Sequence, residues 1–383
     1  MGGEPDPMKV GVPKESLAGE RRVAIVPETA RGLVKGSIQV AVETGAGASA
    51  FFSDAAYIDA GANVTDAATA FGGDAVLKVQ PPTLDEVGRL REGAVLISFL
   101  QPASNADAIV ALAKRKVSAF SLDLVPRISR AQSMDALSSQ AGIAGYKAVL
   151  IAANQLPKFF PLLMTAAGTV APARVLVMGA GVAGLQAIAT ARRLGAVVEA
   201  YDVRPAVKDE VKSLGATFLE LPLEAQEGTG GYAREQSEDF LRRQRELLGD
   251  RVAASDVVIT TASIPGRKAP ILVTADMVRR MRAGSVIVDL AAETGGNVEL
   301  TRAGEIVQVG DITIDGTRNL PSTMPVHASQ LYSKNVSTLL LLLVKDGALK
   351  LDFNDEIVKG ACVTHDGAIV NPRAKELVEA PSR

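Results

Sequence analysis

Short apolar runs alternate with longer stretches of helix-forming residues along most of the chain. The first set of apolar runs lies at 9–12, 39–43, 75–79, 95–100 and 118–122. Short apolar runs that alternate with helical stretches are typical of a parallel sheet covered by helices. The first third of the sequence therefore predicts an α/β domain.

A second alternation follows a long helical stretch at 133–155, which has no flexible linker in it. Its apolar runs lie at 174–178, 196–200, 217–219, 256–261, 285–290 and 312–315, with helical stretches that include 185–194 and 238–247. Six candidate strands separated by helices predict a doubly wound, Rossmann-like domain. Another helical stretch, at 328–345, leads to a tail that we expect to return to the first domain.

The predicted fold class is therefore α/β, with two Rossmann-like domains whose sheets are parallel and which long helices link. The first domain, discontinuous in sequence, covers 1–138 plus 328–383, and the second covers 139–327. The length of 383 residues fits two domains better than one.

Composition and charge narrow the possible partners. Hydrophobic residues make up 47% of the chain and charged residues 22%, and the net charge is −2 without a basic stripe, so nucleic acid is not an expected partner. The most apolar run, 336–344, is half the ~20 residues that a membrane helix needs and predicts a buried helix. The polar N-terminus has no signal-peptide pattern, so we expect a cytoplasmic protein without direct membrane insertion.

One cysteine and two histidines provide neither a disulfide framework nor a metal cluster, so no metal site is expected. Cys362 has no cationic neighbour in sequence and is assigned no role. His327 is expected near a helix start, either making local hydrogen bonds or acting as a general acid. His365, in a tail turn, is expected to face solvent.

The strongest motif is a GxGxxG sequence that directly follows an apolar run and begins a helical one. It reads Gly179-Ala180-Gly181-Val182-Ala183-Gly184. Gly179 permits a tight turn, Gly181 lets the backbone approach a pyrophosphate, and Gly184 allows close packing of helix on strand. Ala180 and Val182 are expected beside the pyrophosphate. The alternative is a glycine-rich turn without a ligand.

The next apolar run ends at Asp202, 18 residues after Gly184, where a carboxylate is able to accept hydrogen bonds from the adenosine ribose. Its charge would repel the 2′-phosphate of NADP, which favours NAD(H). Arg204 is able to pair with that phosphate, so the choice of nucleotide stays open at this point. Val203 completes the predicted adenosine side of the site.

Several further motifs resemble one family over essentially the whole chain. They are Lys14-Glu15, Glu20-Arg-Arg-Val-Ala, Lys78-Val-Gln-Pro81, the glycine turn and Val288-Asp-Leu-Ala-Ala-Glu293-Thr-Gly-Gly296. Together they are similar to the framework of alanine dehydrogenases and of the NAD(H)-binding component of proton-translocating transhydrogenases. The resemblance leaves two activities to be separated by chemistry.

Oxidative deamination of an amino acid needs an acid/base and a cation for the substrate carboxylate, and the resemblance to alanine dehydrogenases implies a Lys, a His and an Asp for this task. The sequence keeps a lysine candidate, Lys78. The histidine position holds Gln101, which cannot exchange a proton near neutral pH, and the acidic position holds Glu293. These two departures favour the transhydrogenase component.

Residues 127–138 resemble the loop that transhydrogenases place around the nicotinamide ring. By this resemblance Gln132 binds the nicotinamide ribose or carboxamide, while Arg127, Asp135 and Ser138 fix the loop. Hydride transfer between two nicotinamides needs no general base. The alternative for 133–138 is a capped helix start with a solvated charge pair.

A glycine-rich insertion at 224–232 resembles the family's mobile loop, in which Tyr232 covers the bound nucleotide. The resemblance also implies nucleotide contacts from Gly231 and Gln244, and from Ala262 and Ser263 in the turn after the fourth strand of the second domain. The alternative for the insertion is a tolerated surface loop.

The resemblance implies a subunit of an NAD(P)+ transhydrogenase that is Si/Re-specific and proton-translocating, and that acts only with its partners. Those partners are an NADP(H)-binding subunit, which holds NADP(H), and a membrane-spanning subunit that would place this chain on the cytoplasmic face of the inner membrane. A homodimer is also implied. The chain contains neither a second GxGxxG after the first nor a transmembrane run, so a split-gene subunit is expected. An alanine dehydrogenase and a non-catalytic NAD-sensing module are the alternatives.

Overall fold

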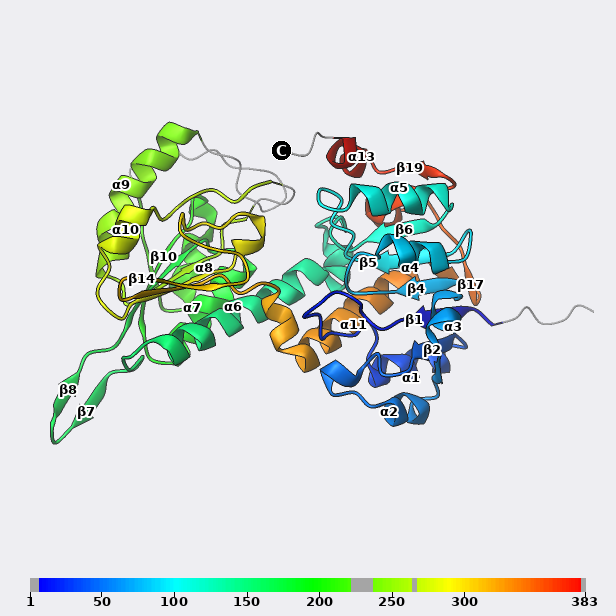
Figure 1. Cartoon of the computed structure of the whole chain (residues 1–383), viewed down its shortest axis with the longest axis horizontal. Helices are drawn as coiled ribbons and strands as arrows, with labels where there is room; N and C mark the ends of the chain where they lie inside the picture. Colours follow the sequence, from blue (N-terminus) through cyan, green and yellow to red (C-terminus); the bar gives the residue numbers. More distant parts are fainter. Residues whose placement is uncertain (1–6, 222–236, 264–266, 380–383) are drawn as a thin grey trace, which may run out of the picture. The chain divides into compact units, whose positions relative to one another are not determined.

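The computed structural model describes residues 7–221, 237–263 and 267–379. The chain forms two compact units: unit 1 comprises residues 1–140 and 322–383, and unit 2 comprises residues 141–321. From the sequence, we expected the chain to pass from the first domain to the second after residue 138 and to return after residue 327. The chain passes between the units within α6 (Ala136–Gln155) and within the short 3-10 helix η5 (Leu320–Thr323) (Figure 1).

Unit 1 contains, among the described residues, an eight-stranded sheet in the order β19-β18-β6-β5-β4-β1-β2-β3. The first six strands along the chain pair in parallel, whereas β18 runs antiparallel beside β6 and β19 antiparallel beside β18. Their bounds are β1 (Lys9–Val12), β2 (Gln39–Glu43), β3 (Asn63–Thr65), β4 (Ala75–Leu77), β5 (Val95–Ser98), β6 (Ser118–Ser121), β18 (Cys362–His365) and β19 (Ala368–Ile369). The tail thus returns to the first sheet, as the sequence predicts.

Helices and one hairpin complete unit 1. They are α1 (Pro27–Lys35), α2 (Asp54–Asp59), α3 (Ala67–Phe71), α4 (Leu84–Arg89), α5 (Ala106–Lys114), α11 (Pro325–Leu342), α12 (Glu356–Ala361), α13 (Pro372–Glu379) and the hairpin of β16 (Val344–Lys345) and β17 (Ala348–Leu349). None of the helices in the described ranges combines the length and apolar character that a bilayer crossing needs.

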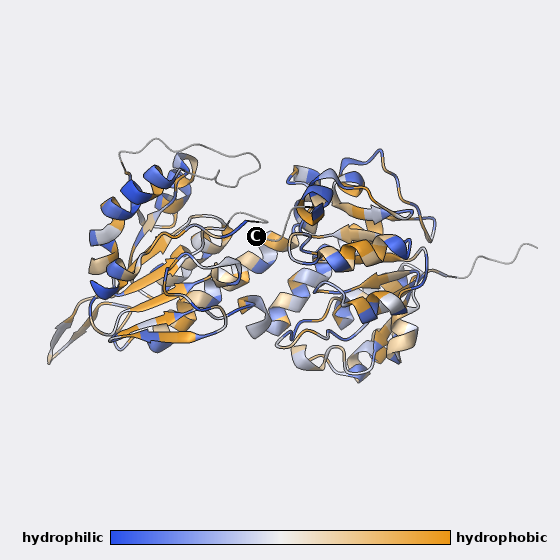
Figure 2. Cartoon of the chain, turned by 45° about the horizontal axis from the view of Figure 1, so that its top comes forward, coloured by the Kyte–Doolittle hydropathy of each residue, from blue (hydrophilic) through white to orange (hydrophobic). Residues whose placement is uncertain are grey.

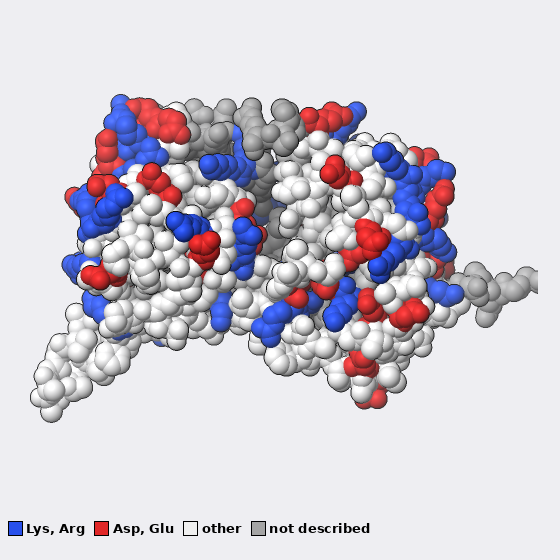
Figure 3. Space-filling view, in the orientation of Figure 1, with Lys and Arg blue, Asp and Glu red and all other residues white. Residues whose placement is uncertain are grey.

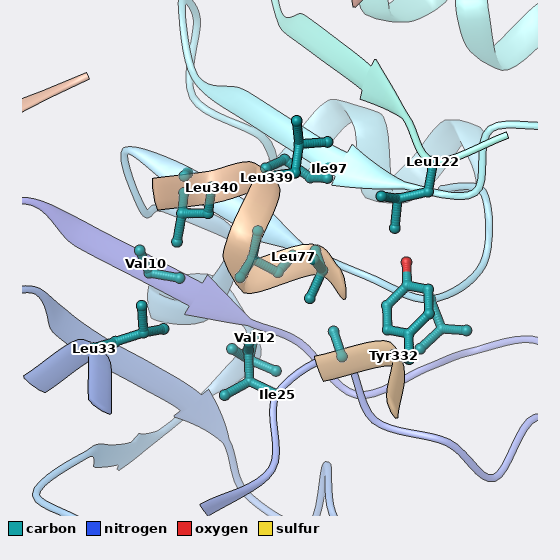
Figure 4. Close-up of a cluster of buried hydrophobic side chains, with 14 of the residues drawn as sticks. Val10, Val12, Ile25, Leu33, Leu77, Ile97, Leu122, Tyr332, Leu339 and Leu340 are labelled. Carbon is teal, nitrogen blue, oxygen red and sulfur yellow. The ribbon is translucent and has the colours of Figure 1, made fainter. Parts of the chain in front are cut away.

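Helix α11 forms the centre of a large apolar core in unit 1. Figure 4 shows side chains of α11 beside side chains from the strands of the sheet. The labelled residues are Val10, Val12, Ile25, Leu33, Leu77, Ile97, Leu122, Tyr332, Leu339 and Leu340. The apolar run 336–344 is helical as far as Leu342, where α11 ends, and Val344 begins β16. Val336, Leu339, Leu340 and Leu343 are fully shielded, whereas Leu341 is 52% exposed. Burial of the shielded side chains stabilises the unit through the hydrophobic effect.

Tyr332 joins this core to the sheet, because its hydroxyl donates a 2.6 Å hydrogen bond to the Lys78 carbonyl. Tyr332→Phe is expected to lower the free energy of unfolding by about 1 to 2 kcal/mol, since it leaves a buried carbonyl without its donor. Urea denaturation measures the change, with Tyr146→Phe, whose ring is exposed, as the control. Equal stability of the two variants would refute this contribution.

Unit 2 contains a seven-stranded sheet in its described residues, in the order β11-β10-β9-β12-β13-β15-β14. Neighbours are parallel except for β14, which is antiparallel to β15. The bounds are β9 (Arg174–Met178), β10 (Val197–Tyr201), β11 (Thr217–Phe218), β12 (Val257–Thr260), β13 (Val286–Asp289), β14 (Ile306–Val309) and β15 (Ile312–Asp315). The strand order reverses next to β9, as it does in doubly wound dinucleotide folds.

Both faces of this sheet are buried, because alternate strand residues point to opposite sides and helices cover each side. Side chains of α6, α7 (Val182–Arg193) and α8 (Lys208–Ser213) pack on one face. Side chains of α9 (Glu238–Ala254) and α10 (Ala275–Arg279) pack on the other. Figure 2 shows the resulting hydrophobic strands and the hydrophilic outer surface of α9. On the face drawn in Figure 3, acidic and basic side chains are interspersed and neither sign forms a continuous area.

The expected α/β class, the two Rossmann-like units and the discontinuous first unit are confirmed. Some local expectations are wrong. The helix expected from 133 begins at Ala136, after the 3-10 helix η2 (Ser129–Met134), and the one expected from 185 begins at Val182. His365 does not lie in a solvent-facing turn: it belongs to β18, its Nδ1 lies 2.9 Å from the Ser118 hydroxyl, and its ring contacts Phe353.

Unit 2 also carries an antiparallel hairpin, formed by β7 (Leu163–Thr165) and β8 (Gly168–Val170), that the sequence did not predict. It extends away from the rest of its unit (Figure 1). Met164 is 74% exposed, and Leu162 and Val170 are also exposed. The hairpin therefore presents apolar side chains to its surroundings.

Candidate functional site

The glycine turn after β9 is shaped by contacts that exclude side chains at two of its three glycines. Gly179 has a φ of +106°, and a Cβ there would lie 2.4 Å from the Thr261 hydroxyl oxygen. A Cβ on Gly184 would lie 1.8 Å from the Gly179 carbonyl oxygen. At Gly181 the nearest atom to such a Cβ is 3.9 Å away, on Arg204. The chain's own packing thus demands two glycines, while the third leaves room for a molecule to approach the backbone.

Helix α7 begins directly after this turn, with Gly181 as its N-cap and no side-chain cap on its first amides. Such a helix start carries a partial positive charge and unpaired N–H groups, which suit a phosphate. Val182 at this position is exposed, whereas Ala180 is buried. The start of α7 is therefore suited to an anion.

Asp202, directly after β10, connects the glycine turn to Arg204. Its carboxylate accepts hydrogen bonds from the Ala180 N–H at 2.7 Å and from the Arg204 N–H at 2.8 Å. The Arg204 guanidinium also donates to both carboxylate oxygens, at 2.9 and 2.8 Å. Val203, between Asp202 and Arg204, is partly buried and packs against the apolar cluster on the sheet face that α9 and α10 cover. The structure thus places the predicted adenosine-side residues together at the carboxyl ends of β9 and β10.

The turn after β12 lies against the glycine turn. The Thr261 hydroxyl donates a 3.0 Å hydrogen bond to the Gly179 carbonyl, and the Thr261 N–H donates to the Met178 carbonyl at 2.9 Å. Ala262 is half-buried and Ser263 is exposed. The family resemblance pointed to Ala262 and Ser263, but no local pattern pointed to Thr261, whose role depends on a contact 82 residues away.

Gln244, on α9, is the remaining described candidate in unit 2. Its side chain is 1% exposed, and its Oε1 has no hydrogen-bond partner within the described part of the chain. Buried carbonyl oxygens are normally paired, so this amide is suited to accept from a bound molecule. Gly231, Tyr232 and the proposed lid at 224–236 lie outside the described residues.

In unit 1, the loop at 127–138 is fixed by its apolar residues and by a helix cap. Ala131 and Met134 are buried in the core, whereas Gln132 is exposed between them. The Asp135 carboxylate accepts from the Ser138 N–H at 2.9 Å and from its hydroxyl at 2.6 Å. This is an N-cap for α6, so the capped helix start is present. The cap also holds in place the segment that exposes Gln132.

Arg127 lies exposed at the start of the same loop. The loop is further tied to α11, because the Asn335 side-chain amide donates to the Ser133 carbonyl at 2.8 Å. Its backbone is therefore held from both the core and α11.

Lys78, the lysine candidate of the sequence, lies in a buried ion-pair cluster in unit 1. Its side chain is 1% exposed and its Nζ lies 3.1 Å from Glu86 and 3.3 Å from Glu15. Burial lowers the pKa of Lys78, but the two carboxylates outweigh burial and raise it above its usual range. The Glu15 and Glu86 carboxylates therefore keep the Lys78 amine charged although it is buried.

Gln101, after β5, is exposed and has a φ of +46°. Both its N–H and that of Leu100 donate to the Asp123 carboxylate at 2.8 Å, which holds this turn. Burial raises the pKa of Asp123. Glu293, in unit 2, is exposed and accepts a hydrogen bond from the Asn319 N–H at 2.5 Å.

Burial raises the pKa of the Cys362 thiol to about 12, so this cysteine is a poor nucleophile.

Models of two protein domains match nearly the whole chain. The description "Alanine dehydrogenase/PNT, N-terminal domain" applies to residues 11–144 and "Alanine dehydrogenase/PNT, C-terminal domain" to residues 148–372. The chain belongs to the alanine dehydrogenase/PNT family. The predicted resemblance is confirmed.

Within this family, the chain is 49% identical to the first of the polypeptides that make up NAD(P) transhydrogenase subunit alpha of Rhodospirillum rubrum, over 95% of this chain and 98% of that protein. It also resembles the crystal structure of transhydrogenase from Sinorhizobium meliloti, with a TM-score of 0.84, 45% identity, and coverage of 95% of this chain and 99% of that one. An L-alanine dehydrogenase structure has a similar TM-score, 0.82, but 28% identity, over 97% and 99% of the two chains. Both branches share the fold, and the sequence is more similar to the transhydrogenases.

Proposed function

We propose that the chain binds NAD(H) in unit 2 and presents NADH for direct hydride transfer to NADP+ held on a partner subunit. It would act as the NAD(H)-binding subunit of a Si/Re-specific, proton-translocating NAD(P)+ transhydrogenase. The observation that carries this proposal is the 49% identity to a transhydrogenase subunit over almost the whole of both chains. The site geometry supports it independently.

Binding of a dinucleotide is supported by the glycine turn and the uncapped start of α7. In this proposal Gly179, Gly181 and Gly184 form the pyrophosphate turn with Ala180 and Val182, while Asp202, Val203 and Arg204 bind the adenosine ribose. Gly231, Gln244, Ala262 and Ser263 would complete the contacts. The buried Asp202 carboxylate favours NAD(H), because it would repel a 2′-phosphate.

Transfer to a second nicotinamide, rather than to an amino acid, is supported by the chemistry of unit 1. Gln101 cannot carry a proton, and Lys78 is enclosed by Glu15 and Glu86. We propose that Gln132 orients the nicotinamide, that Arg127, Asp135 and Ser138 fix its loop, and that Tyr232 closes over the nucleotide. Orientation of two rings within roughly 3 to 3.5 Å is what hydride transfer requires of the protein.

The proposal includes partners. An NADP(H)-binding subunit would supply the second nucleotide, and a membrane-spanning subunit would couple transfer to proton translocation. The chain would then lie peripherally on the cytoplasmic face of the inner membrane through these subunits.

A homodimer also belongs to the proposal, and the exposed apolar hairpin of β7 and β8 is suited to contact a second copy. Met164→Arg is expected to raise the dimer dissociation constant at least tenfold, because a charge would have to be buried in the interface. Analytical ultracentrifugation measures it, with Ile306→Arg, an exposed apolar residue on β14, as the control. Equal dimerisation of both variants and the wild type would exclude the hairpin from the interface.

The deciding experiment mixes the purified chain with a separately prepared transhydrogenase NADP(H)-binding component. Hydride transfer from NADPH to a nicotinamide-ring analogue of NAD+ is followed by the absorbance of the reduced analogue, which differs from that of NADPH. The parallel assay measures L-alanine-dependent reduction of NAD+. We expect transfer that requires both proteins and no alanine oxidation. Alanine oxidation by the chain alone would overturn the proposal, and NADH binding without transfer would favour an NAD-sensing module.

A further inference from the structure

A single buried asparagine, Asn297, joins three segments of unit 2. It follows two glycines with positive φ, Gly295 at +102° and Gly296 at +81°, in the turn after β13. Its N–H donates to the buried Asp289 carboxylate at 2.8 Å. Its carbonyl accepts from the N–H groups of Leu272 and Val273 at 2.8 and 3.0 Å. Asn297 is 0% exposed, so its backbone is held on both sides.

The side chain of Asn297 holds the turn after β12. Its Oδ1 accepts from the Ala262 N–H at 3.0 Å, and its Nδ2 donates to the Ala262 carbonyl at 2.8 Å. The second Nδ2 hydrogen goes to the Pro270 carbonyl at 2.9 Å. Both donors of the amide are therefore used, and the amide pairs with both backbone groups of Ala262.

The backbone conformation at Ala262 affects the proposed nucleotide site through the neighbouring residue. The preceding residue, Thr261, contacts the Gly179 carbonyl through its hydroxyl. A shift of Ala262 would therefore move Thr261 against the glycine turn, where a Cβ on Gly179 already has no room. The Asn297 amide fixes the backbone on which this contact depends.

We propose that Asn297 is a positioning residue of the nucleotide site, which holds the Thr261–Ser263 turn in its binding conformation through Ala262. This inference rests on the proposed function, because it takes the bound molecule to be NADH. Asn297 does not itself touch the nucleotide in this proposal. Its effect is on affinity, through the turn, and not on the orientation of the nicotinamide.

If Asn297 had only a structural role, its replacement would lower stability without a selective effect on NADH binding. Thr301 provides the matched control. The Thr301 hydroxyl donates to the same Asp289 carboxylate at 2.7 Å but makes no hydrogen bond to Ala262. Asn297→Ala and Thr301→Ala each remove hydrogen bonds from one buried network. Only the first releases the turn after β12.

We expect Asn297→Ala to raise the Kd for NADH about tenfold, measured by fluorescence titration, and Thr301→Ala to leave it within twofold, although both lower Tm. The rate of hydride transfer at saturating NADH should stay within about threefold of the wild type for Asn297→Ala. If the alanine variant does not fold, Asn297→Ser, which removes less volume, is expected to raise Kd in the same direction. An unchanged Kd in a folded variant, or an equal rise in the Thr301 variant, would overturn the proposal.

Amide exchange without nucleotide separates this inference from the proposed function. The Ala262 amide should exchange faster in Asn297→Ala than in the wild type, and at the wild-type rate in Thr301→Ala. Failure of the wild type to bind NADH would reject the proposed function. Unchanged exchange at Ala262 in the asparagine variant would reject the positioning role whether or not NADH binds.

Discussion

Gln132→Ala is expected to slow hydride transfer about a hundredfold while leaving the Kd for NADH within a few fold. Gln132 is exposed on η2 between two buried residues, Ala131 and Met134, so its removal should not alter the loop backbone. The lost contact acts on the orientation of the nicotinamide, and a displacement of about 1 Å is enough for a hundredfold loss of rate. This corresponds to about 2.7 kcal/mol of transition-state stabilisation.

Stopped-flow transfer at saturating NADH and equilibrium titration, made on the same preparation, measure the two quantities. Ser133→Ala changes the neighbouring exposed side chain of the same 3-10 helix and is expected to keep both values. An equal loss of affinity and rate in the Gln132 variant would mean that Gln132 is only a binding contact.

Asp202→Asn is expected to weaken NADH binding roughly 10- to 100-fold, the range for losing a hydrogen bond to a charged group. The asparagine keeps the shape of the side chain and an acceptor for the Ala180 N–H. It removes the charge that pairs with Arg204, whose guanidinium lies 2.8 Å from the carboxylate. Arg204 would then be able to bind a 2′-phosphate, so the preference for NADH over NADPH should fall.

Titration with both nucleotides measures this change. Glu199→Gln is the matched control, because Glu199 lies on the same strand, β10, and pairs with Arg251 at 3.3 Å. It is expected to leave both affinities unaltered. Retention of NADH affinity by the Asp202 variant would remove Asp202 from the proposed site.

The elements that the sequence predicts well are those buried on both faces. Strands such as β9 and β12 are continuous apolar runs, and each lies within about one residue of its expected bounds. Several of the missed strands are partly exposed: β14 alternates exposed and half-buried positions, and the hairpin of β7 and β8 is largely exposed. The strand β18 was also missed although it is largely buried, because only Cys362 and Val363 of its four residues are apolar. Such segments lack the apolar run on which strand prediction depends.

The candidate site divides in the same way. The glycine turn and Asp202 were predictable because each follows a strand, at the spacing that is typical of dinucleotide-binding folds. Asn297 was not, since its partners Ala262 and Pro270 are 35 and 27 residues away in sequence. The enclosure of Lys78 also could not be predicted, because Glu15 lies 63 positions before it and approaches only through the fold. Local patterns predict turns that are suited to a ligand, whereas long-range polar partners can be found only from the structure.

The antiparallel strand β18 sets an order for folding during synthesis on the ribosome. Its partner β6 ends at Ser121, but β18 begins only at Cys362, after all of unit 2 has been made. Unit 2 is one continuous segment and is able to complete its sheet first, while β6 keeps an open edge until residues 362–365 emerge. The nascent chain thus carries an unpaired strand edge for most of its synthesis, and such an edge is a template for pairing with other chains.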